Sequence, residues 1–365
     1  MRLAKQLQAL ASILRDSGGN VGRPGAIPRL LGLSLGSDPL LGAMQQRRVY
    51  VSQEDGTMTR ADLMNRLSAA ASQLRANAHF SSDKPDETPE STSQALWLAA
   101  AGQPRAASRS GTALPELTPA QADQFELLLG RRLAGEPLAY LIGRQEFMGN
   151  EFYTAPGALI PRRETELLGH AALELARERA TAAGDVKILD LCTGSGNIAV
   201  ALAIGEPRAR ICGTDLEADA LALAARNVEL HGVSDRVTLR QGDLFAALDG
   251  HDDAPVGFDI IVCNPPYIPS HKAKAMPIEV GGFEPPAAFD GGDFGLSILF
   301  RLVAEGPSHL APGGWLCFEL GAAQGSLLER RLSGRKAFSE IRAVRDQEGA
   351  VRVLAARRGA AGSGQ

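Results

Sequence analysis

The sequence predicts an α/β protein with a doubly wound, mostly parallel sheet of seven strands, preceded by a small helical domain. From Glu164 onward, apolar strand-like runs alternate with helix-like segments, the order that builds a parallel sheet covered by helices on both faces. Residues 58–145 instead contain helix-like segments joined by polar loops. The 365 residues of the chain accommodate both parts, because a domain commonly takes roughly 100–200 residues.

The composition excludes several classes of protein. Apolar residues make up 44% and charged residues 22% of the chain, which argues against disorder as the main state. The net charge is −4, and direct nucleic-acid binding is not expected without a basic excess. No apolar run of about 18 residues occurs, so no membrane span is expected. The four cysteines form no CxxC pair and no HExxH motif occurs, which favours free thiols and no metal site.

Residues 1–57 differ from the rest of the chain. They are rich in arginine and poor in acids, and residues 3–14 can form an amphipathic helix that ends before Gly18. One interpretation is an organelle transit peptide. The other is an N-terminal extension, disordered or packed on the next domain, in a protein of the cytoplasm.

The helical domain, residues 58–145, is expected to contain helices over 61–78, 94–102 and 120–135. Thr118 and Pro119 have the residue types of an N-cap and a first helical turn. Residues 146–160 hold short extended runs broken by glycine and proline, which indicates a hairpin linker.

Residues 161–358 are expected to form the α/β domain, and residues 359–365 a disordered tail. The last two strand-like runs are joined by a connection too short for a parallel crossover, so one strand at that edge should be antiparallel. The seven strands are expected at 186–191, 209–216, 236–244, 258–263, 313–321, 338–344 and 350–356.

The loop after the first strand of this domain has the composition of a ligand-binding turn. Gly194 and Gly196 allow positive φ angles and a close approach of backbone to ligand. Cys192 stands where the dinucleotide fingerprint has its first glycine, which favours a nucleoside without a diphosphate. Asp215, at the end of the second strand, can accept hydrogen bonds from both ribose hydroxyls. The alternative is a tight structural turn with a surface aspartate. The loop residues expected to contact the ligand are Asp190, Cys192, Thr193, Gly194, Ser195 and Gly196.

Two further motifs follow later strands. Asp243 can accept from an adenine amino group and Leu244 can cover a base, although a solvated turn has the same composition. Asn264-Pro265-Pro266-Tyr267 is more specific. Its two prolines fix an extended backbone without N–H donors, Asn264 adds a side-chain carbonyl oxygen, and Tyr267 offers an aromatic face. The motif is suited to holding a planar NH2 group.

In this order, DLCTGSGNIAVALA, Asp215, GDLF and NPPY resemble a class I S-adenosylmethionine-dependent methyltransferase. GEPLAYLIG (135–143), EFMGNEF (146–152) and LIPRRETELL (159–168) are similar to the HemK/PrmC family, which methylates a glutamine side chain in class I peptide-chain release factors. The resemblance implies a Rossmann-like methyltransferase domain, S-adenosylmethionine as cofactor, and a release factor as protein partner.

The resemblance also implies roles for individual residues. Asn264 and Pro265 are expected to be catalytic, their oxygens accepting the two N–H groups of the substrate amide, while Pro266 and Tyr267 pack against it. Asn264 is also expected to contact the cofactor. Arg162 and Glu164 either shape the substrate loop or form a surface ion pair.

Several positions depart from the family pattern, so substrates other than a release factor remain as alternatives. These positions are Arg163, Cys192, Leu244 and Phe294. The alternatives are another protein glutamine, such as one in a ribosomal protein, a small-molecule nitrogen and, less favoured, the N6 atom of adenine in DNA.

Overall fold

A computed structural model of the chain describes residues 60–78, 80, 84–109, 113–250 and 257–359. All the described residues belong to one compact unit. The expected helix over residues 3–14, the transit-peptide interpretation and nearly all of the expected tail lie outside the described residues. In the described part, no helix has the length and apolar character needed to cross a membrane.

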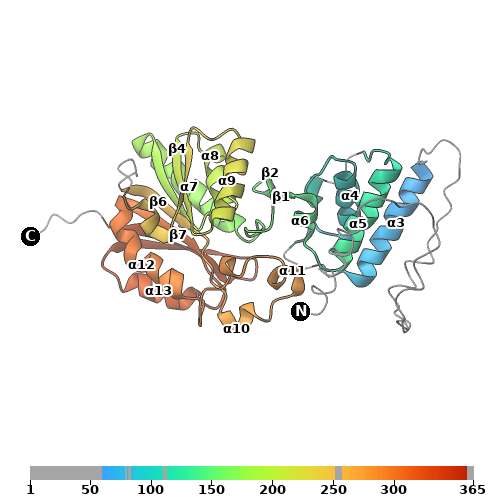
Figure 1. Cartoon of the computed structure of the whole chain (residues 1–365). Coiled ribbons are helices and arrows are strands. Elements are labelled where there is room, and N and C mark those ends of the chain that lie inside the picture. Colours follow the sequence, from blue (N-terminus) through green and yellow to red (C-terminus); the bar gives the residue numbers. More distant parts are fainter. Residues whose placement is uncertain (1–59, 79, 81–83, 110–112, 251–256, 360–365) are drawn as a thin grey trace, which may run out of the picture. The chain divides into compact units, whose positions relative to one another are not determined.

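Helices form the N-terminal part of the described chain (Figure 1), and they pack around an aromatic pair. Trp97 and Phe125 are fully buried with ring centroids 5.2 Å apart, and the Trp97 indole nitrogen donates to the Pro115 carbonyl at 2.8 Å. The elements are α3 (Arg60–Asn77), α4 (Pro89–Ala100), η1 (Ala107–Arg109), α5 (Pro119–Leu133) and α6 (Leu138–Ile142).

Both long helices after α3 begin with a capping box. Thr118 caps α5 and Pro119 occupies its first turn, as predicted. The start predicted for α4 was wrong. The helix begins at Pro89, inside an expected polar loop, because Thr88 and Ser91 cap each other's backbone N–H groups.

A β-hairpin follows α6. It pairs β1 (Arg144–Phe147) with β2 (Asn150–Tyr153), so it starts two residues before the predicted linker. Met148 and Gly149 at its tip have φ of 48° and 74°, the left-handed values that a two-residue type I′ turn requires. Phe147 and Phe152 are buried.

The seven-stranded sheet has the order β5-β4-β3-β6-β7-β9-β8 (Figure 1). All its pairings are parallel except those of β9, which runs antiparallel to both β7 and β8. The prediction of an antiparallel strand at this edge is therefore confirmed. The strand is β9, which lies between β7 and the edge strand β8. The strands are β3 (Val186–Leu191), β4 (Ala209–Asp215), β5 (Val237–Gln241), β6 (Phe258–Cys263), β7 (Leu310–Glu319), β8 (Phe338–Arg345) and β9 (Val351–Arg358).

Helices cover both faces of this sheet (Figure 1). Successive strand residues point to opposite faces, so Ile188 of β3 packs with one helix layer and Leu189 with the other. This double burial explains the continuous apolar runs of the sequence. One layer holds α7 (Glu166–Ala183), α8 (Asn197–Gly205) and α9 (Ala218–Leu230), and the other holds α12 (Ser297–His309) and α13 (Gly325–Ser333).

The segment between β6 and α12 contains short helices that the sequence pattern did not reveal. Each is too short to show helical periodicity. Arg132 of α5, only 2% exposed, contacts this segment, with its guanidinium 3.3 Å from Glu279. These elements are α10 (Ser270–Ala273), α11 (Ile278–Gly281) and η3 (Pro286–Ala288), and a further turn, η2 (Leu244–Leu248), follows β5.

Candidate functional site

The loop between β3 and α8 takes a strained backbone path. Cys192, Gly194 and Gly196 have φ of 57°, 55° and 76°, which glycine tolerates and cysteine rarely adopts. An added Cβ on Gly196 would lie 3.0 Å from the Ala224 Cβ, so glycine lets the loop pass close to α9. An added Cβ on Gly194 would meet open space, on the side where the loop lines a cavity.

Asp190 supports this loop from within the core. Its Oδ2 atom accepts from the Thr193 hydroxyl at 2.6 Å and from the Ala199 backbone N–H at 3.1 Å. Burial raises the pKa of Asp190 to about 7, against the lowering effect of these two hydrogen bonds. Asp190 was predicted to contact the cofactor, and the structure places it behind the loop that lines the cavity.

Asp215 lies at the carboxyl end of β4 and lines the cavity. Its Oδ2 atom accepts from the Gly194 N–H at 2.8 Å and its Oδ1 atom from the Glu217 N–H at 3.0 Å. Burial raises its pKa, although backbone hydrogen bonds oppose the effect. Each carboxylate oxygen has a second acceptor position, so the hydrogen bonds to the loop leave capacity for ligand hydroxyls.

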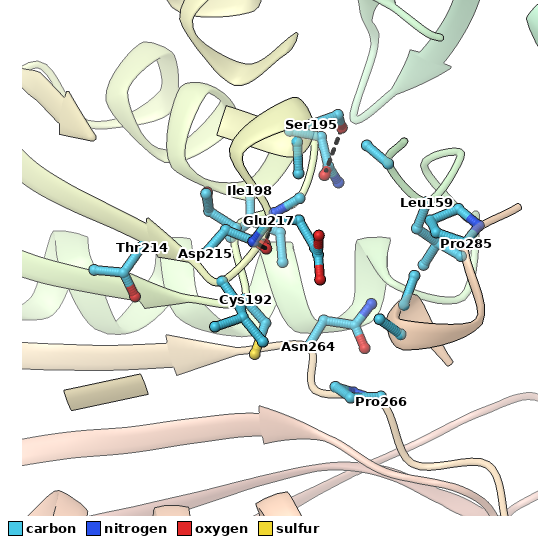
Figure 2. A pocket seen from close by; sticks show the side chains of 18 of the residues that line it. Leu159, Cys192, Ser195, Ile198, Thr214, Asp215, Glu217, Asn264, Pro266 and Pro285 are labelled. Atoms are coloured by element: carbon cyan, nitrogen blue, oxygen red, sulfur yellow. Dashed lines mark hydrogen bonds between the residues drawn. The ribbon is translucent and has the colours of Figure 1, made fainter. Parts of the chain in front are cut away.

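Glu217 was not identified from the sequence. It lines the same cavity, and Figure 2 shows its carboxylate extending into it near Asp215. The sequence signal that could have identified Glu217 is its position two residues after Asp215, the aspartate at the end of β4.

The predicted base-binding residues Asp243 and Leu244 also line the cavity. Leu244 is 5% exposed, with φ of 51°. Both carboxylate oxygens of Asp243 accept from one guanidinium nitrogen of Arg301 at 2.9 Å. Arg301 lies in α12 and orients Asp243, a role that sequence spacing did not reveal.

These residues enclose one large cavity, with about 1030 Å³ of empty space including its mouth. Nine of the predicted site residues line it, while Gly196 lies behind the wall. Residues before α7 and after β6, among them Leu159 and Pro285, complete it and were not predicted. The nine are Cys192, Thr193, Gly194, Ser195, Asp215, Asp243, Leu244, Asn264 and Pro266.

Glu284 joins the two segments that complete this cavity. It is 3% exposed and accepts from the Ile160 backbone N–H at 3.1 Å and from the Arg162 guanidinium. Arg162 was predicted to shape the substrate loop or to pair with Glu164. Its guanidinium forms an ion pair with Glu284, which follows the NPPY motif along the chain. A role of Arg162 in shaping the substrate loop stays a prediction.

A second cavity, with about 670 Å³ of empty space, lies on the other side of Asn264. Pro265 and Tyr267 line it, together with the apolar residues Ile268 and Phe289. Asn264 lines both cavities. Its Nδ2 atom donates to the Thr165 hydroxyl oxygen at 3.1 Å, which leaves Oδ1 as its free acceptor. Figure 2 shows its side chain extending from the end of β6 toward the wall formed by Leu159 and Pro285.

This geometry suits a reaction between two ligands. One cavity presents a glycine loop and acids, the other presents the NPPY backbone, and an oriented amide oxygen lies where they meet. A group held in the first cavity would therefore lie beside a group held in the second.

The comparisons with known proteins agree with this geometry. Two family models match, "Methyltransferase small domain" over residues 172–279 and "PrmC N-terminal domain" over residues 67–143. The chain is 41% identical over 243 residues to the release factor glutamine methyltransferase of Geobacter sulfurreducens, covering 67% of this chain and 81% of that protein. It is 38% identical over 262 residues to that of Moorella thermoacetica, covering 72% and 88%.

Proposed function

The chain belongs to the HemK/PrmC family of release factor glutamine methyltransferases, and from this premise we propose that it methylates the GGQ glutamine of a class I peptide-chain release factor on its side-chain amide nitrogen, with S-adenosylmethionine as methyl donor. The observation that carries the proposal is the position of Asn264 in the walls of both cavities. The proposed location is the cytoplasm, where translation takes place, and the alternative is an organelle if residues 1–57 are a transit peptide.

The first cavity fits the proposed cofactor. The missing side chain of Gly194 leaves room for the ligand against the loop backbone. Asp215 offers acceptor positions suited to a ribose, and buried Leu244 offers an apolar surface suited to a base. When bound, S-adenosylmethionine supplies a methyl group that is already strongly electrophilic.

The chain must therefore position a poor nucleophile rather than activate the donor. An amide nitrogen attacks weakly because its lone pair is delocalised into the carbonyl group. Alignment within about 3–3.5 Å of the carbon it attacks removes a large part of such a barrier. Asn264 Oδ1 and the Pro265 carbonyl oxygen accept the two N–H groups of the amide and hold its plane.

These two oxygens also stabilise the transition state. As the nitrogen forms its new bond it gains positive charge, so both hydrogen bonds strengthen. The two prolines keep backbone N–H donors away from this place. No general base is needed before transfer, since the proton can leave to water afterwards.

The second cavity suits a glutamine side chain. Its apolar wall, Ile268 and Phe289, can cover the methylene groups, while Asn264 and Pro265 present oxygens to the amide. Tyr267, whose hydroxyl donates to Glu319 at 2.8 Å, forms a further part of the wall.

A transfer assay with radiolabelled S-adenosylmethionine tests the proposal. The substrates are a class I release factor, the same factor with its GGQ glutamine changed to alanine, bulk ribosomal protein and DNA. Label on the release factor that disappears in the variant supports the proposal. Label on ribosomal protein or DNA alone identifies one of the other substrates and contradicts it.

A further inference from the structure

The NPPY backbone is held by a side chain from a distant part of the sequence. Resting on the proposed function, we propose that Gln324 is a positioning residue, which fixes the Pro265 carbonyl oxygen by holding the carbonyl group of Tyr267. Gln324 is only 9% exposed, stands directly before α13 and lies outside the predicted site. As the described residues form them, neither of the two cavities has Gln324 in its wall.

The side-chain amide of Gln324 joins three segments. Its Nε2 atom donates to the Tyr267 carbonyl oxygen and to the Gly295 carbonyl oxygen, both at 3.0 Å. Its Oε1 atom accepts from the Gly321 backbone N–H at 2.9 Å. Although Gln324 is the N-cap residue of α13, its side chain makes no hydrogen bond to that helix. The amide instead connects the end of NPPY, the segment before α12 and the turn after β7.

Donors and acceptors fix the orientation of this amide. Gly321 offers an N–H group, so it faces the amide oxygen, whereas Tyr267 and Gly295 offer carbonyl oxygens, which face the NH2 group. The Phe294 carbonyl oxygen also lies 3.4 Å from Nε2. A reversed amide would place its oxygen against these carbonyl oxygens and its NH2 group against the Gly321 N–H. The observed orientation is therefore strongly preferred.

Tyr267 is held at both its ring and its backbone. Its hydroxyl donates to Glu319 Oε1 at 2.8 Å, at the end of β7, and its carbonyl oxygen accepts from Gln324. Gly291 packs against the same backbone, since an added Cβ on Gly291 would be 3.0 Å from the Tyr267 Cα atom. Tyr267 cannot move without breaking one of these contacts.

The Pro265 carbonyl group lies between two anchored points. Before it, Cys263 ends β6 and is paired with the neighbouring strands β3 and β7. After it, Gln324 holds Tyr267. The two prolines in between have fixed φ angles, so few bond rotations remain that could turn the Pro265 oxygen away. Anchoring both ends of this short, stiff segment sets the direction of the oxygen that the proposed mechanism uses.

Two substitutions separate the hydrogen bonds of Gln324 from its packing. Gln324→Met keeps the length of the side chain but removes both donors. Gln324→Glu is closer in shape and keeps an oxygen for Gly321, yet it offers at most one hydrogen to the two carbonyl groups. We expect kcat to fall about 10- to 100-fold in both variants, the effect of misplacing a reacting group. Affinity for S-adenosylmethionine should stay unchanged, because Gln324 lies outside the wall of that cavity.

Glu206→Met is the matched control. Glu206 is 5% exposed, and its carboxylate accepts from the Arg208 backbone N–H at 3.0 Å and from Arg208 Nε at 3.1 Å. It lies just before β4, at the amino end of the strand, whereas Asp215 in the cavity wall lies at the carboxyl end. With kcat expressed per cofactor-binding site, so that unfolded enzyme is not counted, we expect a normal value in Glu206→Met.

Two kinetic results would overturn the proposal. One is an equal loss of kcat in Gln324→Met and Glu206→Met, which would indicate a general effect of removing a buried polar group. The other is a near-normal kcat in Gln324→Glu, which would show that the shape of the side chain matters and its two donors do not.

A measurement without substrate keeps this test separate from the proposed function. Tyr267-Ile268 is the only Tyr-Ile pair in the chain, so labelling the tyrosine carbonyl carbons with 13C and isoleucine with 15N gives one correlated nuclear magnetic resonance signal. We expect the Tyr267 carbonyl resonance to shift upfield in Gln324→Met, because it loses a hydrogen bond, and to stay in place in Glu206→Met. If Gln324→Met does not fold, the same comparison is made with Gln324→Glu.

An unmoved carbonyl resonance overturns the positioning role of Gln324 whatever the substrate is. Absence of methyl transfer to a release factor by the unaltered enzyme contradicts only the proposed function.

Discussion

The backbone of Gly295 passes so close to Tyr267 that a Cβ on Gly295 would overlap the Tyr267 carbonyl oxygen. Gly291, four residues earlier, lies equally close to Pro266, because an added Cβ on Gly291 would be only 2.5 Å from the Pro266 carbonyl oxygen. Because these two glycines have no side chain, the segment before α12 can pack directly against the NPPY backbone. The two glycines at 291 and 295 in the sequence GGDFGL (291–296) therefore have a steric explanation.

Gly295→Ala should lower methyl transfer by displacing the NPPY backbone. Gly295 has φ of 67°, so the substitution adds backbone strain to the overlap. Gly349→Ala is the matched control, because Gly349 has φ of 84° and open space around the added Cβ. We expect transfer to fall at least about tenfold more in Gly295→Ala than in the control, through misplacement of the reacting groups. Equal activities in the two variants would show that the contact is unimportant.

Asn264→Ala should reduce kcat by about 10²-fold or more, the effect of removing one positioned transition-state hydrogen bond, roughly 2.7–4 kcal/mol. Binding of S-adenosylmethionine should change little, since the loop and Asp215 form most of that cavity. Rapid-quench assays and calorimetry measure the two quantities. Near-normal turnover in this variant would remove Asn264 from the mechanism.

Asp215→Ala should weaken binding of the cofactor. The change removes the ribose acceptor and also frees the Gly194 and Glu217 N–H groups that the carboxylate holds. Asp215→Asn is the matched control, because it keeps one acceptor oxygen in the same volume. We expect affinities in the order wild type, asparagine, alanine by calorimetry. An unchanged affinity in Asp215→Ala excludes this residue from the cofactor site.

Asp190 should make stability depend on pH. Burial raises its pKa to about 7, from about 4 in an unfolded chain. The folded state therefore holds the proton more tightly, and this contribution to stability is complete below pH 4 and is lost as pH rises to 7. Each pKa unit corresponds to about 1.4 kcal/mol.

Asp190→Asn tests this linkage. Its oxygen can keep the hydrogen bonds of Oδ2, and its NH2 group replaces Oδ1, which has no hydrogen-bond partner in the described structure. Measured by urea unfolding, the stability of the variant relative to wild type should increase between pH 4 and 7. Parallel curves for the two proteins would contradict the raised pKa.

Much of the fold could be predicted because its elements leave patterns within short stretches of the sequence. The apolar runs of β3 and β6 follow from double burial, and the Thr118 cap is encoded within four residues. The end of β6 and the glycine loop were likewise predicted to bind ligands, and residues of both line the first cavity. Each is defined by neighbouring residues and by the rule that ligands gather at the carboxyl ends of parallel strands.

The remaining parts of the site depend on contacts between distant segments. Arg301 reaches Asp243 from 58 residues away, and Thr165 reaches Asn264 from 99 residues away. Nothing in the spacing of such residues shows that they meet. The short helix α11 could not be predicted either, because its four residues are too few to display an amphipathic period.

The most direct test of the central claim is to locate the methyl group. The enzyme and its Asn264→Ala variant would each be incubated with S-adenosylmethionine and a class I release factor, and the product would be analysed by tandem mass spectrometry. We predict one methyl group on the side-chain nitrogen of the GGQ glutamine with the wild-type enzyme and almost none with the variant. A methyl group on any other residue, or equal labelling by both enzymes, would contradict the account.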